Sequence, residues 1–193
     1  MGRTGCIKFR HDPEYGDAIW GLAEVSYGND QVDEALRWYR RYSELYPDDP
    51  ESEHMVAALG DGPKPSRASD AYVRETFDHF AEDFDRQLLD DLEYRAPKLI
   101  HALFREIPGA ETENLDILDA GCGTGLAGIE FRHHAAVLIG VDLSPEMLKR
   151  AKEREIYDDL LEMELAGYMR DRAGAFDLIV AADVFCYIGD LAE

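Results

Sequence analysis

The stretch LDILDAGCGTGLAG, residues 115–128, decides the fold, because an apolar run leads directly into a turn with four glycines. Two patterns overlap in this turn. Residues 123–128 satisfy G-x-G-x-x-G, the fingerprint of a dinucleotide site. Residues 119–125, DAGCGTG, instead place an acid two residues before the first of three alternating glycines. The two patterns imply different ligands, so the surrounding sequence has to decide between them.

Apolar segments alternate with helical patterns on either side of this turn. After the first segment, strands are predicted at residues 136–141, 160–165 and 176–181, the last almost wholly apolar, as in a strand covered on both faces. Ser144, followed by Pro145, marks the start of an amphipathic helix. Strands alternating with helices predict the α/β class, with a Rossmann-like, doubly wound parallel sheet.

An acidic residue stands at the end of each predicted strand. The four are Asp119, Asp142, Glu164 and Asp183. Ligands of such sheets bind beyond the carboxyl ends of the strands, where bare glycines let the main chain approach them. Asp142 fits the ribose in either kind of site, whereas Asp119 beside the glycines would repel a pyrophosphate. The pattern therefore favours a cationic nucleoside ligand, although each acid could also cap a turn or a helix.

Three blocks carry a resemblance to a known family. They are LDAGCGTG, GVDLSPEMLKRAKER and FDLIVAADVFCYIGDL, in the order and at the separation usual in that family. Residues from about 72 to 193 resemble the N-terminal part of a class I S-adenosylmethionine-dependent methyltransferase. The resemblance implies S-adenosylmethionine as the cofactor and direct displacement of its methyl group by an unidentified acceptor. It indicates no catalytic base and no metal ligands.

The resemblance also implies roles for residues around the glycine turn. Asp119 would orient this turn and contact the methionine ammonium group, in part through water. Gly121 and Gly123 would give the backbone access to the cofactor. Asp142 would accept hydrogen bonds from both ribose hydroxyls.

Further roles follow for residues beside the adenine and the acceptor. Leu143 would pack on the adenine, and Glu164 would accept from its amino group, if the strand before it keeps this register. Asp183 would lie near the methionine portion and the acceptor. The helix that carries Tyr72 and Phe77 would close over the cofactor.

The N-terminal third has a different organisation. Residues 1–60 resemble one tetratricopeptide repeat and part of another, residues 61–70 are rich in Pro, Gly and Ser like a linker, and residues 71–193 form the methyltransferase-like domain. Two helices are expected, split at residues 28–30. The positions that match the repeat are Leu22, Ala23, Ala35, Tyr39 and Pro47, and Pro13 lies one repeat period before Pro47. An unrelated helical hairpin is the alternative, and a repeat would indicate a protein partner.

Composition limits the location and the partners. The net charge of -21 makes a nucleic-acid partner unfavourable. Cys6, Cys122 and Cys186 are far apart and predict reduced thiols in a cytoplasmic protein, and no apolar run is long enough for a membrane span. His133 and His134 fall between the first helix and the second strand, where we expect solvated loop residues and no metal site.

The family's sheet has seven strands in the order 3-2-1-4-5-7-6, and this sequence supplies four of them. We therefore expect a partial domain, whose strand edge at residues 178–180 would favour self-association. Two alternatives to a methyltransferase stay open: an NAD-dependent oxidoreductase, and a non-catalytic cofactor-binding scaffold whose repeat binds a partner.

Overall fold

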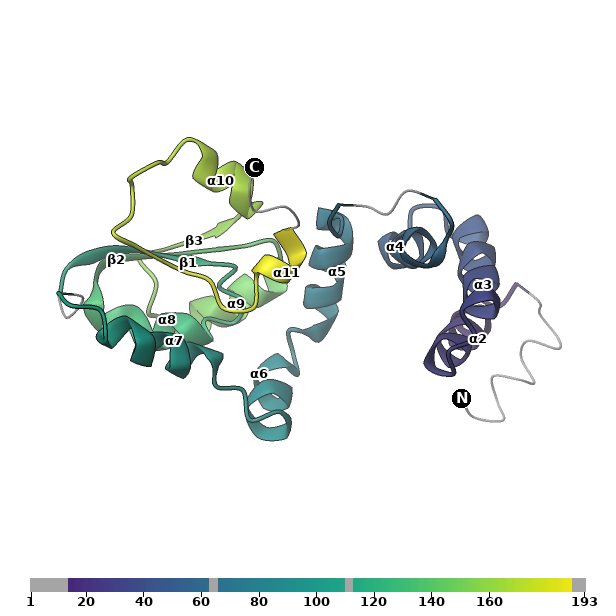
Figure 1. Ribbon diagram of the computed structural model, residues 1–193, viewed down its shortest axis with the longest axis horizontal. Coiled ribbons are helices and arrows are strands. Elements are labelled where there is room, and N and C mark those ends of the chain that lie inside the picture. Colours follow the sequence, from purple (N-terminus) through teal and green to yellow (C-terminus); the bar gives the residue numbers. More distant parts are fainter. Residues whose placement is uncertain (1–13, 63–65, 110–112, 189–193) are drawn as a thin grey trace. The chain divides into compact units, whose positions relative to one another are not determined.

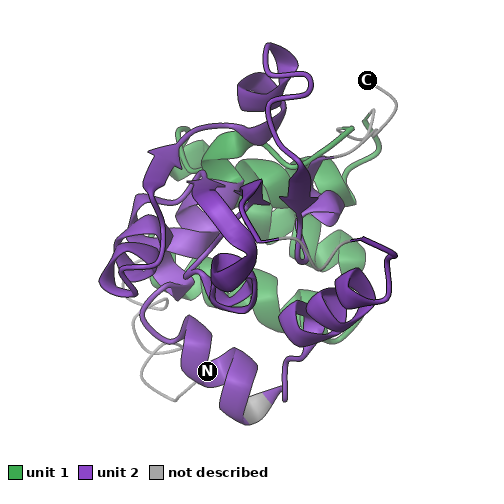
Figure 2. Cartoon of the chain, turned by 90° about the vertical axis from the view of Figure 1, so that its left-hand side faces the viewer, with its two compact units in different colours: residues 1–72 green, residues 73–193 purple. Residues whose placement is uncertain are grey.

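The computed structural model describes residues 14–62, 66–109 and 113–188 (Figure 1). Cys6 and Pro13 lie outside these ranges. The chain divides into two compact units, residues 1–72 and 73–193 (Figure 2). In the described ranges, no helix has both the length and the apolar character that a membrane crossing requires.

The first unit is built from three helices. They are α2 (Gly16–Gly28), α3 (Val32–Leu45) and α4 (Pro50–Leu59). The break between α2 and α3 falls where the sequence predicts it, and Asp30 in this turn has a φ of 58°. Ala23, Ala35 and Tyr39 are buried between the helices, and the ring of Trp20 packs edge-on against Tyr39. The small residues let the two helices approach closely around these aromatic rings.

The second unit contains a four-stranded parallel sheet. Its strands are β1 (Leu115–Ala120), β2 (Ala135–Asp142), β3 (Asp159–Glu162) and β4 (Leu178–Val180), in the order β3-β2-β1-β4. This order places β1 and β2, with the loops that follow them, in the interior of the sheet. The predicted doubly wound α/β fold is confirmed.

Helices cover both faces of this sheet (Figure 1). On one face lie α7 (Ala96–Arg105), α8 (Leu126–Phe131) and α9 (Pro145–Glu153), and on the other lies α10 (Leu165–Arg170). The other elements of this part are α5 (Asp70–Phe80), α6 (Phe84–Arg86), η1 (Gln87–Asp91), η2 (Arg132–His134) and α11 (Phe185–Ile188). Ile117 packs with Phe131 of α8, whereas its neighbour Leu118 packs with Tyr168 of α10. Both faces of β1 are therefore buried, which explains its continuous apolar run.

The fourth strand differs from its prediction. It spans three residues, and the side chain of Ile179 at its centre is 46% exposed, while Val180 is buried. The expectation that both faces of this strand are covered is therefore wrong for the part of the chain that the structure describes. The alternation along a strand places Ile179 on the face opposite to Val180, and no described element buries it there.

Candidate cofactor site

The glycine turn leads from the end of β1 into α8. Gly121, Gly123 and Gly125 have φ values of 67°, 52° and 90°, which are unfavourable for residues with a side chain. A Cβ atom on Gly121 would lie 2.5 Å from a methyl group of Val184, the residue after Asp183. A Cβ atom on Gly123 would meet no atom within 4 Å. Gly121 is thus required by packing inside the protein, and Gly123 is the position at which the turn faces open space.

Asp119 is buried at the base of this turn, with 1% of its surface exposed. Its Oδ2 accepts a hydrogen bond of 2.6 Å from the hydroxyl of Tyr157, and its Oδ1 is buried with no partner among the described residues. The pKa of this carboxyl is raised from 3.8 to about 6, chiefly by burial and in part by the charge of Asp142, while the Tyr157 hydroxyl and the Gly128 amide act to lower it. The site thus holds a carboxylate that a nearby cation would stabilise.

Tyr157 is a site residue that the sequence analysis missed. A Cβ atom on Gly128 would overlap its hydroxyl, and one on Gly140 would lie 3.0 Å from its ring. Gly128 therefore makes room for the tyrosine beside Asp119, and Gly140 makes room for Leu160 and Cys122 as well as for this ring. Gly140 lies inside β2, and a glycine within a strand is a sequence signal of such a close approach.

Asp142 is the last residue of β2 and joins two loops. Its Oδ2 accepts from the amide of Gly123 at 2.8 Å, and its Oδ1 accepts from the amide of Ser144 at 2.9 Å. Burial raises the pKa of this carboxyl, and these amide donors oppose the rise. A carboxylate has about four acceptor positions, so Asp142 can accept further donors such as ribose hydroxyls. The structure therefore brings Asp142 and Gly123 together, as the sequence predicts.

Helix α5 lies against the loop that follows β2. Arg74 donates from Nε to the carbonyl oxygen of Leu143 at 3.1 Å. The carboxylate of Asp78 accepts from the hydroxyl of Ser144 at 2.5 Å, and Ser144 in turn caps α9 by accepting from the amide of Met147. The sequence predicts that Ser144 begins this helix, and the cap confirms it. The same contacts position the loop that carries Leu143.

A second polar cluster joins α6 to the glycine turn. Thr124 donates from its hydroxyl to Asp85 at 2.5 Å, and Arg154 donates from Nε to the carbonyl oxygen of Thr124 at 2.5 Å. Arg154 also pairs with the carboxylate of Asp85. No sequence motif indicates this cluster, because its three members come from α6, the turn and the end of α9. It ties the turn to α6 and to the end of α9.

Glu164 and Asp183 differ in their surroundings from the two buried acids. Both carboxylate oxygens of Glu164 cap α10, by accepting from the amides of Ala166 at 2.9 Å and Gly167 at 2.6 Å. Asp183 is exposed after β4, with a φ of 57°. Burial raises the pKa of Tyr94, and so does a hydrogen bond to Asp183. Glu164 thus has a structural role as a helix cap, and its predicted contact with adenine stays a prediction.

Aromatic side chains lie beside these strand-end loops. Phe77 of α5 packs edge-on against Phe84, with 6.3 Å between ring centroids, and against Tyr187 of α11, at 5.4 Å. Tyr72, in contrast, stacks on His54 within the first unit, at 4.0 Å. Of the two residues expected to close over the cofactor, Phe77 therefore lies among side chains near the site, and Tyr72 has a partner elsewhere.

The prediction for the two histidines is wrong for His134. This residue is only 7% exposed, because its ring packs against Phe104 and Phe131. His133 is exposed, as expected. Both follow the C-terminal end of α8, whereas the glycine turn precedes its N-terminal end. Of the two described cysteines, Cys122 is buried and Cys186 is exposed, and both are free thiols.

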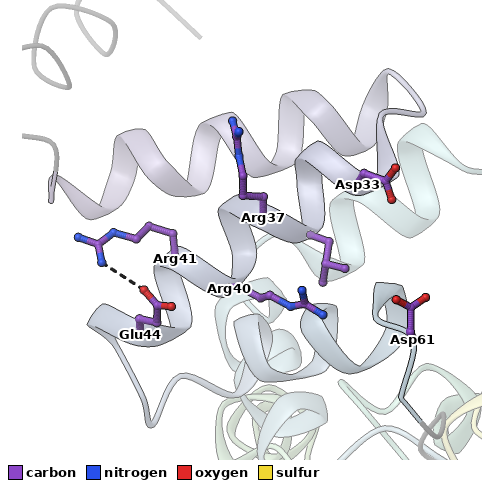
Figure 3. Close-up of a pocket in the computed structure, with 7 residues that line it drawn as sticks. Asp33, Arg37, Arg40, Arg41, Glu44 and Asp61 are labelled. Carbon is purple, nitrogen blue, oxygen red and sulfur yellow. Dashed lines mark hydrogen bonds and ion pairs between the residues drawn. The ribbon is translucent and has the colours of Figure 1, made fainter.

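A separate hollow of about 510 Å³ lies within the first unit (Figure 3). It is lined by Asp33, Leu36, Arg37, Arg40, Arg41, Glu44 and Asp61. Arg37 pairs with Glu34, and Arg41 pairs with Glu14 and Glu44. Arg40 forms no ion pair with any residue that the structure describes. The lining thus combines three arginines with three acids.

Comparisons with known proteins identify relatives of the second unit. A family described as "Methyltransferase domain" matches residues 117–192. Magnesium-protoporphyrin O-methyltransferase of Rhodobacter capsulatus is 39% identical over 79 residues, which are 37% of this chain and 33% of that protein. Methyltransferase-like protein 27 of Homo sapiens is 41% identical over 86 residues, 44% of this chain and 34% of that protein. The chain thus spans about a third of the length of these relatives.

A solved structure, magnesium protoporphyrin IX methyltransferase from Synechocystis PCC 6803 with bound SAH, aligns with 60% of this chain and 59% of its own. The TM-score is 0.49, and 19% of the residues are identical. Residues 117–192 are thus similar to the class of S-adenosylmethionine-dependent methyltransferase domains. The cofactor of this class is S-adenosylmethionine, and the site fits it. The unpartnered Oδ1 of Asp119 suits a cationic ligand, and the backbone at Gly123 is open.

Proposed function

We propose that this chain binds S-adenosylmethionine at the glycine turn and supports transfer of its methyl group to an acceptor by direct displacement. The observation that carries the proposal is the arrangement of Asp119 and Asp142 around Gly123. One carboxylate is buried with an oxygen that has no partner among the described residues, and the other binds the amide of Gly123. This arrangement suits an ammonium group and a ribose, and it opposes a pyrophosphate.

The residues of the site have separable roles in this proposal. Asp142 accepts from the ribose hydroxyls, and its contacts with Gly123 and Ser144 hold it in place. Asp119 stabilises the positive charge of the methionine portion, and Tyr157 orients its carboxylate. When bound, S-adenosylmethionine supplies a methyl group that its sulfonium already activates. Catalysis then requires chiefly alignment with the acceptor, which can contribute about 7–11 kcal/mol.

The acceptor we propose is a flat, largely apolar small molecule that presents an oxygen or nitrogen nucleophile. The relatives include O-methyltransferases and an 18S rRNA (guanine-N(7))-methyltransferase of Bos taurus. The net charge of -21 disfavours RNA for this chain, because its 41 Asp and Glu residues outnumber its 20 Lys and Arg residues and would repel the phosphates. Phe77, Phe84 and Tyr187 offer aromatic rings beside the strand-end loops. A planar acceptor would pack against such rings.

Isothermal titration calorimetry with S-adenosylhomocysteine (SAH) and with NAD tests the cofactor. We expect binding of SAH and not of NAD, and a loss of tenfold or more in SAH affinity for Asp142→Ala, since charge-assisted hydrogen bonds contribute about 1.5–3 kcal/mol. Asp171→Ala, which removes an exposed acid, is the matched control and should bind like the parent chain. Binding of NAD, or an unchanged affinity for SAH in Asp142→Ala, would contradict the assignment.

Methyl transfer itself is tested with methyl-labelled S-adenosylmethionine and a panel of planar phenols, carboxylic acids and magnesium-protoporphyrin. Incorporation of label that Asp142→Ala abolishes supports the proposed activity. Tight binding of SAH without incorporation into any acceptor, or into this chain itself, would favour the non-catalytic scaffold.

We also propose that the helical unit acts as a tetratricopeptide-like module for an acidic protein segment. The buried Ala23, Ala35 and Tyr39 occupy positions expected of the repeat, and the guanidinium of Arg40 in the hollow forms no ion pair with a described residue. Arginine binds carboxylates through two parallel hydrogen bonds. Arg40→Gln should weaken binding of an acidic peptide library, whereas Lys98→Gln, which removes an exposed cation of α7, should not. Equal peptide binding by both variants would show that the hollow is not the binding site.

A further inference from the structure

Three histidines meet at the end of α8, away from the glycine turn. His101 projects from α7, and His133 and His134 are consecutive in η2. A ring nitrogen from each lies within 4.8 Å of the other two, and His101 Nε2 is 3.1 Å from His134 Nε2. Within residues 14–62, 66–109 and 113–188, no other three His, Cys, Asp or Glu side chains come together in this way.

We propose that His101, His133 and His134 form a binding site for a transition-metal ion of the zinc type. Imidazole nitrogens bind zinc at about 2.0–2.1 Å, so two of them on a tetrahedral ion lie about 3.3 Å apart. The observed 3.1 Å between the Nε2 atoms of His101 and His134 is close to that separation. His133 completes the set by a small rotation of its exposed side chain, because the three nitrogens already lie within 4.8 Å. Imidazole favours zinc, copper, nickel and cobalt over magnesium and calcium.

The surroundings of the three rings support a binding site. Glu130 Oε2 lies 3.8 Å from His101 Nδ1, on the side of the ring away from His134. This is an ionic contact longer than a hydrogen bond, and a carboxylate that closes to hydrogen-bond distance orients a metal-bound imidazole. Phe131 packs edge-on against the ring of His101, so this ring has little freedom to turn. The exposed His133 leaves an approach for the ion and a coordination position open to water.

The site would join two elements that are separate in sequence. His101 belongs to α7, and the other two histidines follow α8, against which α7 packs. A bound ion would link these helices across the face of the sheet opposite to α10. The proposal therefore concerns a structural or regulatory metal, independent of the cofactor loops, and it does not depend on the proposed methyl transfer.

Two alternatives to a histidine metal site have to be separated from it by experiment. The rings could form a hydrogen-bonded aromatic cluster that never binds metal, since two neutral imidazoles also approach to 3.1 Å. The acidic surface of this chain could instead bind divalent ions weakly through carboxylates. Excess Mg²⁺ competes for carboxylates and leaves imidazoles free. The visible absorption of Co²⁺ reports nitrogen ligands and a tetrahedral geometry.

The experiment is a titration of the full chain, without an affinity tag, with Co²⁺ in excess Mg²⁺, followed by displacement with Zn²⁺. We expect one ion per chain, an intense visible absorption, and at least a tenfold loss of affinity in His133→Asn, whose exposed position keeps the fold intact. His79→Asn, at an exposed histidine of α5, is the matched control and should bind like the parent chain. Glu130→Gln should weaken binding about 10–100-fold.

Several results would overturn the proposal. One is the absence of a saturable site under excess Mg²⁺. Another is equal affinity of His133→Asn and the parent chain, and a third is a greater loss in His79→Asn than in His133→Asn. A rise in melting temperature with Zn²⁺ that His133→Asn abolishes would support the link between α7 and η2.

Discussion

The hydrogen bond between Tyr157 and Asp119 gives the sharpest test of the site. Tyr157→Phe removes one hydroxyl and keeps the ring that packs against Gly128 and Gly140. In the parent chain this hydroxyl donates to Asp119 Oδ2 at 2.6 Å, while Oδ1 has no partner among the described residues. The variant would therefore leave a buried carboxylate without a side-chain donor. A hydrogen bond to a charged group contributes about 1.5–3 kcal/mol, and we expect that loss in the free energy of unfolding at pH 7.5.

The contribution of Asp119 to the stability of the folded protein decreases as the pH rises. Burial raises the pKa of Asp119 from 3.8 to about 6, so the folded protein holds this proton more tightly than the unfolded chain does. The stability that this group contributes is therefore full below about pH 4, falls as pH rises to about 6, and is constant above that. The difference corresponds to about 3 kcal/mol at 1.36 kcal/mol per pKa unit. At pH 5 Asp119 is mostly neutral, and we expect Tyr157→Phe to cost only about 0.5–1.5 kcal/mol.

Urea unfolding at pH 7.5 and pH 5, followed by far-ultraviolet circular dichroism, measures both values. Both tryptophans, Trp20 and Trp38, lie in residues 1–72, so tryptophan fluorescence reports on the first unit and serves as an internal reference. Tyr168→Phe, at a buried tyrosine on the opposite face of the sheet, is the control and should change stability little. An equal loss at the two pH values, or no loss at pH 7.5, would refute the reasoning about Asp119.

Three further predictions concern the glycine turn and the residues that contact it. Gly128→Ala should destabilise the second unit by more than about 1 kcal/mol in the same urea assay, because its Cβ would overlap the hydroxyl of Tyr157; Gly62→Ala, where a Cβ meets nothing within 4 Å, should not. Arg154→Met should release the glycine turn and weaken SAH binding severalfold in calorimetry. Hydrogen exchange of the Thr124 amide, measured by NMR, should become faster, and an unchanged exchange rate would contradict this role. Asp119→Asn should lower SAH affinity at least tenfold and should remove the fall in the free energy of unfolding between pH 4 and 6. If that fall remains, it belongs to another group.

The fold could be predicted because its signals are local. An apolar run, a glycine turn and a Ser-Pro helix start each specify a piece of backbone, and β1, the turn and α9 form where these signals lie. The positions of Asp119 and Asp142 follow from the fold, because the ends of neighbouring parallel strands meet at one edge of the sheet. The burial of Ile179 failed as a prediction because it depends on what covers β4, which the strand's own sequence does not encode.

The contacts that tertiary structure creates could not be predicted in the same way. Tyr157 reaches Asp119 across 38 residues, and Asp85 reaches Thr124 across 39. Each pair joins segments that carry no common motif. The burial of His134 likewise depends on the rings of α7 and α8, so the residue resembles an ordinary loop histidine until these helices pack.

The glycines of the turn and of α8 are required for different structural reasons, and these reasons indicate which ligand the turn can bind. Gly128, the third glycine of the G-x-G-x-x-G match, accommodates the hydroxyl of Tyr157 inside the protein. The amide of Gly123, the first, already donates to Asp142, so it is not free to bind a phosphate oxygen. A match to the dinucleotide pattern thus arises here from packing around a buried tyrosine and from an acid that ties the turn to β2. What the turn offers a ligand is an open backbone at Gly123 between two carboxylates, and a nucleoside with a cationic side chain complements this surface better than a pyrophosphate does.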